Sequence, residues 1–328
     1  MATGLASNFT IYQDLLKTRI AELLAQNGNA FGAASNNCIQ LVTQSRPGDY
    51  GQASFFKNVS SLITRRDNTS VSTATDLPMT MDEYISVKLS RKIGPVGQTR
   101  DAFKKLLGGS FSPALFTTIL AEEVTNAMQI DMLDSALAGL AASTKQVAAS
   151  YFTASSLGSM SSSTLISTLA KMGDRADRIV AWVMHSKTYF DLVRSQISSN
   201  IVGVSNFNVA SAQPVTMGRP VVVTDSASLL WGSSPDVQQY YTLGLVEGAA
   251  LVENTEEQEV VIQDVTGLQT LGIRYQGEFA YNLGLKGFKW DTTSGGANPT
   301  LAATKDGNNW DVAFADLKDR AGVVITST

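Results

Sequence analysis

The segment between residues 45 and 100 places the strongest constraint on what this chain can fold into. Two runs of polar, basic and β-branched residues flank a turn-forming sequence near Asp67 and Asn68, which predicts a long two-stranded excursion. An isolated pair of strands is marginally stable in water, and this segment has too few large apolar residues to form its own core. We therefore expect it to rest on another surface, most simply that of a neighbouring copy of the chain.

The composition favours a protein with buried subunit interfaces. Hydrophobic residues make up 44% of the 328 residues and charged residues only 16%, compared with roughly 25% in typical soluble domains. A membrane-spanning helix needs ~18 or more apolar residues in a row, and no stretch approaches this. Protein interfaces, whose cores are poor in charge, are the better explanation. The N-terminus lacks the basic patch and apolar run of a secretory signal, so we expect cytoplasmic synthesis.

Charge is divided unevenly along the chain. Residues 46–105 contain ten Lys or Arg and six Asp or Glu, a net charge of +4, whereas residues 106–328 carry a net charge of −8. Arg65, Arg66 and Asp67 fall at the expected tip of the excursion. A single-strand nucleic-acid platform would need aromatic residues between the basic ones, and the segment lacks them. We therefore expect these three residues to contact a neighbouring subunit, with the basic loop docking on its acidic body.

Two stretches have the periodicity of helices. Apolar residues at three- and four-residue spacing predict an amphipathic helix over residues 9–26, which the stretch 28–37 would end. Its balanced charges favour packing on protein over a membrane surface. A longer helix of roughly 45 Å is predicted over residues 112–143, with Ser112 as N-cap and Pro113 at the first position. Its period runs through Phe116, Leu120, Val124, Ala127, Ile130, Leu133, Leu137 and Leu140. We expect this helix to be a spine for other elements.

The remainder of the chain alternates between helical and strand patterns. After a serine-rich boundary, helices are predicted at residues 164–174 and 187–196, and strands at 179–184, 220–224 and 240–247. Residues 259–290 alternate as further strands, and residues 310–328 predict a short helix and a strand. This order predicts an α+β fold rather than the doubly wound sheet of many enzymes.

The sequence contains no recognisable catalytic, cofactor-binding or metal-binding motif. His185 is the only histidine and follows an apolar strand pattern, and no G-x-S-x-G nucleophile elbow is present. Cys38 is the only cysteine, which excludes an intrachain disulfide and a thiolate-rich metal site, and we expect it to be a small buried side chain. Zinc, phosphate-loop and dinucleotide motifs are missing, and KDGNNWD is interpreted as a turn because it fits no complete calcium pattern.

Two groups of carboxylates are candidates for the acid pair of a glycoside hydrolase, but the sequence pattern of each group argues against that role. Glu122 and Glu123 are adjacent on the predicted helix and diverge by roughly 100°, whereas hydrolysis needs two carboxyls facing across a cleft. The second group is expected to form a solvated connection between strands and consists of Glu253, Glu256, Glu257 and Glu259. An α+β hydrolase stays an alternative for which no site is apparent.

The order of these parts resembles the major capsid proteins of tailed bacteriophages, whose fold is shared with encapsulins. IVAWVMHSKTYFDLVRS is similar to the strand and helix of the axial domain in that family, and MGRPVVVTDS to the strand after it. LGLVEGAALVENTEEQEVVIQDV and the strands after it are similar to the returning strands. The resemblance implies an N-terminal arm (1–44), an extended β-hairpin loop (45–105), a peripheral domain with the spine helix (106–154 and 250–328), and an axial domain (155–249).

The resemblance also implies a function. The chain would be a structural protein and not an enzyme, assembling with itself as pentamers and hexamers of an icosahedral shell around double-stranded DNA. Scaffolding, portal and decoration proteins would be further partners, and the DNA would be contacted non-specifically. No cofactor, small-molecule substrate or membrane is expected, and the protein would reside in the virion after assembly in the bacterial cytoplasm. The alternatives are an encapsulin-like compartment and, less similar in length and strand content, a tail-tube subunit.

Overall fold

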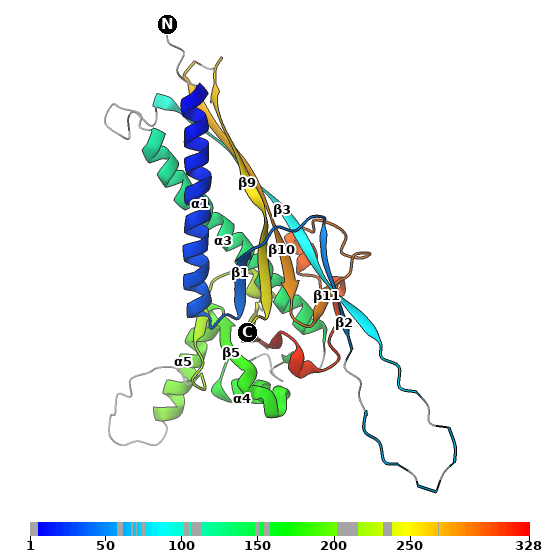
Figure 1. The fold of residues 1–328 in the computed structure, drawn as a ribbon. Helices are drawn as coiled ribbons and strands as arrows, with labels where there is room; N and C mark the ends of the chain where they lie inside the picture. The colour runs from blue at the N-terminus through cyan, green and yellow to red at the C-terminus, as the bar shows by residue number, and fades with distance from the viewer. Residues whose placement is uncertain are drawn as a thin grey trace.

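The chain folds around two long helices and two β-sheets (Figure 1). The computed structural model describes residues 6–328 apart from residues 58–61, 67, 70, 74–75, 102–104, 106–112, 148–150, 154–157, 202–215, 232–237 and 268. This mixture of helix and sheet confirms the predicted α+β class. Among the described helices, none combines the length and apolar character needed to cross a membrane.

Helix α1 (Ala6–Ala34) packs along α3 and the edge of the first sheet (Figure 1). Its buried residues Leu16, Ile20 and Leu24 recur every four positions and therefore lie on one face. The prediction that this helix ends near residue 26 was wrong. The helix continues because Phe31 packs against the hydrophobic core, and tertiary packing outweighs the low helix propensity of the glycines in its last turns.

Helix α3 (Pro113–Gln146) confirms the predicted spine and extends it by three residues. The buried face of its first half differs from the prediction, since Ala127 and Ile130 are exposed whereas Met128 and Met132 are buried. In its second half residues 135–144 are buried on every side. This happens because α3 contacts strands of both sheets and so lies between them.

The first sheet contains the predicted two-stranded excursion. Its strands lie in the order β1 (Ile39–Thr43), β9 (Ala250–Val265), β10 (Gly272–Leu285), β3 (Met81–Thr99) and β2 (Tyr50–Phe56). Strands β2 and β3 form the antiparallel pair, with Tyr50 opposite Val87 and Phe56 opposite Met81. Residues 87–99 of β3 pair with β10, so this part of the excursion is held in the sheet of its own subunit. The loop between β2 and β3 spans residues 57–80, and the strand pattern predicted on both sides of residue 67 does not form strands in the described residues.

The second sheet contains most of the predicted strands from the middle of the chain. Its order is β4 (Tyr151–Thr153), β13 (Gly322–Ser327), β8 (Gln239–Val246), β5 (Ile179–Met184) and β6 (Val221–Val223), with β7 (Leu230–Trp231) paired to β8. Helices α4 (Ser162–Leu169) and α5 (Ser186–Ile201) and the 3₁₀ segment η1 (Ala170–Arg178) flank it. Strand β13 lies in this sheet, although the sequence places it with the returning strands of the first.

The C-terminal region closes the core between the two sheets. Strands β11 (Phe288–Trp290) and β12 (Trp310–Val312) form a small antiparallel pair, in which the rings of Trp290 and Trp310 meet edge to face at 4.8 Å. Short helical segments complete this part of the chain: η2 (Ala227–Leu229), α6 (Leu301–Thr304), η3 (Gly307–Asn309) and η4 (Leu317–Asp319). The sequence KDGNNWD forms η3 and the start of β12, so it is a tight turn as predicted.

Candidate assembly surface

The loop of residues 57–80 leaves the body of the molecule beyond the β2–β3 pair (Figure 1). Large apolar side chains on this loop stand in solvent; Ile63 is 96% exposed and Leu62 is 71% exposed. Other exposed apolar residues of the loop and its edges are Phe56, Val71, Leu77, Met79 and Met81. A concentration of exposed apolar side chains on one segment marks an interaction surface.

Two of the three predicted contact residues lie on this loop. Arg65 and Arg66 are exposed, and neither forms an ion pair with any residue that the structure describes. Asp67 lies outside the described residues. The two guanidinium groups are therefore available to a partner, beside the exposed apolar residues Leu62 and Ile63.

The base of the loop is held by ion pairs around Asp82. The Asp82 carboxylate lies 2.8 Å from the Lys57 ammonium and 3.1 Å from that of Lys289 on β11. Burial alone would raise the pKa of Asp82, but hydrogen bonds from Lys57, the Glu83 amide and Lys289 outweigh it and lower this pKa from 3.8 to about 2. The ring of Phe55 also packs edge to face on Phe314, with 5.1 Å between centroids. These contacts fix where the loop leaves the body.

Half of the basic residues of the segment 46–105 form ion pairs within the subunit. Of its ten Lys and Arg residues, five form ion pairs with described acidic residues of the same chain: Arg46, Lys57, Lys88, Arg91 and Arg100. Arg65 and Arg66 are two adjacent members of the five that remain; Lys92 lines the groove described below, Lys105 is exposed, and Lys104 lies outside the described residues.

Glu253 corrects the prediction for the second carboxylate group. Glu253, Glu256 and Glu259 lie within β9 and not in a connection, and the side chain of Glu253 is only 3% exposed. Arg46 contacts both Glu253 carboxylate oxygens, at 2.7 and 3.0 Å, and the Asn282 amide donates to one of them at 2.9 Å. Burial raises the pKa of the nearby Tyr84, and the Glu253 charge raises it further. The cluster joins the β1–β2 connection to the sheet.

A second polar cluster ties the sheet to α3. Asp131 on α3 accepts hydrogen bonds from Arg91 Nε at 2.8 Å and from the Tyr281 hydroxyl at 2.7 Å. The Tyr281 hydroxyl also lies 2.8 Å from Ser135 Oγ. Burial and the Asp131 charge raise the pKa of Tyr281, so this hydroxyl acts as a neutral donor in the cluster.

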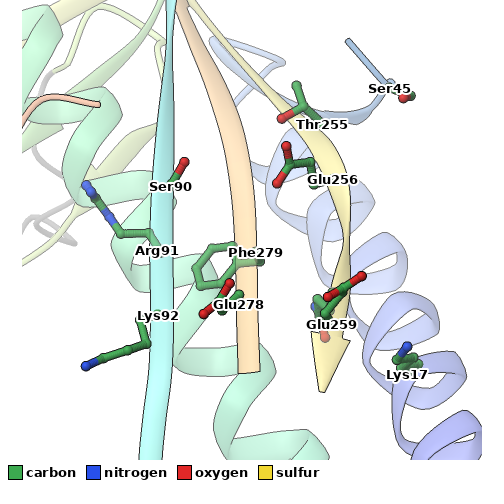
Figure 2. Close-up of a pocket in the computed structure, with 11 residues that line it drawn as sticks. Lys17, Ser45, Ser90, Arg91, Lys92, Thr255, Glu256, Glu259, Glu278 and Phe279 are labelled. Carbon is green, nitrogen blue, oxygen red and sulfur yellow. The ribbon is translucent and has the colours of Figure 1, made fainter. Parts of the chain in front are cut away.

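An open groove of about 710 Å³ crosses β3, β10 and β9 beside α1 (Figure 2). Glu259 and Glu278 are direct neighbours across the two strands, and both are exposed. Glu256 forms an ion pair with Lys88, and Lys17 and Lys92 also line the groove. Small-molecule sites are usually enclosed and largely apolar, whereas this groove is a mixed-charge surface. It offers contacts to a protein partner more readily than a place for a substrate.

The remaining candidates from the sequence have structural roles. His185 follows β5 as predicted; its Nδ1 accepts a hydrogen bond from the Lys187 amide at 3.2 Å, and its ring lies 4.8 Å from that of Tyr240. Cys38 is fully buried, and burial raises the pKa of its thiol. Glu122 and Glu123 are exposed on α3. Within the described ranges, no group of three or more His, Cys, Asp and Glu residues is placed to hold a metal ion.

Sequence reasoning did not find Asp82, Lys289 or the partner of Glu253. Each of these pairs joins residues 207 positions apart in the sequence. Long-range packing brings them together, since β11 with Lys289 contacts β3 with Asp82, and the β1–β2 connection with Arg46 lies against β9 with Glu253. Neither composition nor periodicity contains that information.

Comparison with known proteins identifies the family. The Gp13-like family, described as major capsid protein 13-like, matches residues 8–324. Among solved structures, the capsid asymmetric unit of cyanophage Pam1 is similar with a TM-score of 0.52 and 11% identity, covering 89% of each chain. The capsids of Ralstonia phage GP4 (TM-score 0.49, 13% identity, 90% of this chain and 88% of that one) and of Myoviridae phage XM1 (0.49, 11%, 89% and 90%) are also similar. No curated protein matches.

The fold likeness to Pam1 agrees with the family match over nearly the whole chain. It also agrees with the loop of exposed apolar and basic residues, which suits a protein that binds its own copies. The chain belongs to the Gp13-like family of major capsid proteins, which are structural, non-enzymatic components of the shells of tailed phages.

Proposed function

We propose that this chain assembles as pentamers and hexamers into a closed icosahedral shell around a double-stranded DNA genome. The observation that carries the proposal is the loop of residues 57–80, whose exposed apolar residues are not covered by the described part of their own subunit. Burying such residues against other copies would recover roughly 25 cal/mol for each Å² of apolar surface removed from water. One loop per subunit then gives each copy a contact to a neighbour.

Arg65, Arg66 and Asp67 are proposed as contacts between subunits. The support is that Arg65 and Arg66 are exposed beside the apolar residues of the loop and are not engaged by a described carboxylate. Basic residues next to exposed apolar ones suit an interface with an apolar centre and a charged rim. Asp67, at the same tip in the sequence, would extend the charged part of the contact.

The proposed domain division follows the sequence expectation, with one change. The arm (1–44), extended loop (45–105), peripheral domain (106–154 and 250–328) and axial domain (155–249) are supported by the two separate sheets. Because β13 pairs with both β4 and β8, we propose that these two outer strands, residues 151–153 and 322–327, belong with the axial part. Assembly would take place in the host cytoplasm, and scaffolding, portal and decoration proteins are proposed as further partners of the shell.

Electron microscopy of the chain expressed alone and with its neighbouring genes tests this proposal. Closed shells or capsomer rings are the expected result. Shells that protect double-stranded DNA from nuclease when the packaging genes are present would support a genome container, whereas shells that enclose a protein cargo would favour an encapsulin-like compartment. A uniform monomer under every condition would overturn the proposal.

A further inference from the structure

An apolar pocket of about 250 Å³ lies between the C-terminal end of α1, the middle of α3 and the strands β5 and β6. Its apolar lining includes Phe31, Ile39, Leu133, Leu137, Val183 and Val222. Two further lining residues stand partly in solvent, since Ile130 is 61% exposed and Val223 is 44% exposed. An apolar cavity of roughly 150 Å³ accepts a benzene-sized group, so this pocket has room for one aliphatic side chain and part of its backbone.

The rim of the pocket is acidic. Asp134 is part of the lining, and its carboxylate accepts a hydrogen bond from Ser226 Oγ at 2.5 Å. Asp225 follows the lining residue Thr224 and is 73% exposed. Asp134 forms no ion pair with a described residue. Asp225 is next to the lining rather than part of it, and its carboxylate lies 3.6 Å from His185, an imidazole that is charged only when protonated. No Lys or Arg lines the pocket, so the rim attracts a basic partner.

The loop of residues 57–80 has the complementary pattern. Leu62 and Ile63 are exposed aliphatic residues, and Arg65 and Arg66 follow directly along the chain. We propose that Ile63 of one copy inserts into this pocket of a second copy, where Arg65 and Arg66 pair with Asp134 and Asp225. The inference rests on the proposed function, because it specifies where the loop of one subunit docks on another.

The spacing of the two groups fits this arrangement. In extended backbone, side chains two residues apart point to the same side and their Cα atoms are separated by roughly 7 Å. Ile63 lies at a bend and residues 62–66 form no strand, so the proposal requires this segment to become extended on docking. Arg65 would then follow Ile63 on the same side, and Asp134 lies within the pocket that Ile63 would enter. A guanidinium held at the mouth of an apolar pocket faces less water than one on an open surface, which strengthens its attraction to a carboxylate.

The docking must take place between copies. The loop leaves the body beside β2 and β11, whereas the pocket lies by the lower end of α1 and β5 (Figure 1). The contact at Asp82 fixes the base of the loop on the β11 side. The pocket of the same subunit is consequently on a different side of the molecule from the base of the loop, and a second copy can present the same pocket to the loop.

Cysteine cross-linking in assembled shells tests the inference. The native Cys38 is fully buried and should not react. A chain carrying Ile63→Cys and Val223→Cys should form chains of disulfide-linked subunits on mild oxidation, because the two Cβ atoms would lie within the roughly 3.5–4.5 Å that a disulfide requires. Ile63→Cys with Ile130→Cys is the second variant, should Val223→Cys impair folding. The control is Ile63→Cys with Ile166→Cys, since Ile166 is 52% exposed on α4 and outside the pocket.

Each outcome separates this inference from the proposed function. The docking is supported if the variants with a cysteine in the pocket, at position 223 or 130, give disulfide-linked subunits and the control variant with a cysteine at position 166 does not. Shells that form normally but link only through the control pair, or not at all, overturn the docking and leave the shell function intact. A disulfide within a single chain would also overturn it. If the unmodified chain forms no assembly, both proposals fail together.

The charges give a second readout. Asp134→Arg with Asp225→Arg should reduce shell yield, and combining this pair with Arg65→Asp and Arg66→Asp should restore yield by exchanging the signs on both sides of the contact. A quadruple variant that assembles no better than the Asp134→Arg, Asp225→Arg double variant would contradict pairing between these residues.

Discussion

At the scale of single residues, the buried Glu253 carboxylate depends on Arg46 for its charge balance. The two residues come from segments 207 positions apart, and Asn282 completes the hydrogen bonding of the carboxylate. A carboxylate this deeply buried is stable only while its partners remain in place. The pair therefore fixes the β1–β2 connection on the sheet rather than adding net stability over an apolar alternative.

Replacing Arg46 with Met should destabilise the subunit by roughly 2–4 kcal/mol, because it leaves the Glu253 charge buried without its cation. The lower part of this range is expected since the Arg46 side chain is 36% exposed. Chemical denaturation followed by circular dichroism measures the change. The matched control is Lys88→Met, which breaks the pair with the 54% exposed Glu256 and should cost less than about 1 kcal/mol. Equal losses in the two variants would contradict this account.

The Asp82 carboxylate predicts how the base of the loop responds to acid. Its pKa is lowered to about 2 from 3.8, so the stabilisation it provides is fully present above pH 3.8 and is lost as the pH falls toward 2. Asp82→Asn should therefore reduce the difference in melting temperature between pH 5 and pH 2.5. Asp174→Asn is a suitable control, because Asp174 has a pKa that its partner Lys318 also lowers, yet this pair joins η1 to η4 and not the base of the loop. Hydrogen exchange in β2 should show the effect of Asp82→Asn alone.

At the scale of elements, α3 combines a half-exposed first part with a second part enclosed by both sheets. Small residues permit the close packing in the second part, and Gly139 is one of them. A Cβ at this position would meet Leu285 Cδ1 at 3.1 Å and a ring carbon of Trp310 at 3.2 Å. The helix can approach β10 and β12 this closely because position 139 lacks a side chain.

Gly139→Leu should consequently destabilise the subunit by about 1–3 kcal/mol through overpacking, despite the better helix propensity of leucine. Ala127→Leu on the exposed side of the same helix should change stability by less than about 0.5 kcal/mol. The two unfolding midpoints, measured side by side, check the prediction. A neutral Gly139→Leu would mean that α3 can move away from Leu285 and Trp310 at little cost.

The elements also show which information the sequence contained. The strand predicted at residues 179–184 matches β5 because a continuous apolar run between polar residues defines a buried strand clearly. On α3 the predicted period is correct at Val124, Leu137 and Leu140, which are buried, but wrong at Ala127 and Ile130, whose places in the core are taken by Met128 and Met132. The docking of β13 and the burial of Glu253 depend on long-range pairing, which local patterns do not record. Arg65 and Arg66 could be located from the sequence, whereas the pocket could not.

At the scale of the whole molecule, assembly should depend on salt through the tip of the loop. Arg65→Glu with Arg66→Glu should weaken assembly at low salt and flatten its salt dependence, since exposed ion pairs contribute up to about 1 kcal/mol each and are screened by salt. Light scattering across a salt series measures this. Lys171→Glu with Arg194→Glu changes the net charge equally at two other exposed positions and serves as control. Shells of the loop variant with unchanged salt tolerance would count against the contact.

The ion pairs at Asp82 also limit how far the loop can tilt relative to the body of its own subunit during assembly. The loop of residues 57–80 reaches at most about 40 Å from its base, because about twelve residues lead to the tip and each spans ~3.3–3.6 Å. On such a lever a tilt of about 10° at the base displaces the tip by about 7 Å. Lys57, which directly follows β2, and Lys289 on β11 both form ion pairs with Asp82, so they limit that tilt. The ion pairs of Lys57 and Lys289 with Asp82 would thereby limit the range of angles between neighbouring subunits that the loop can bridge.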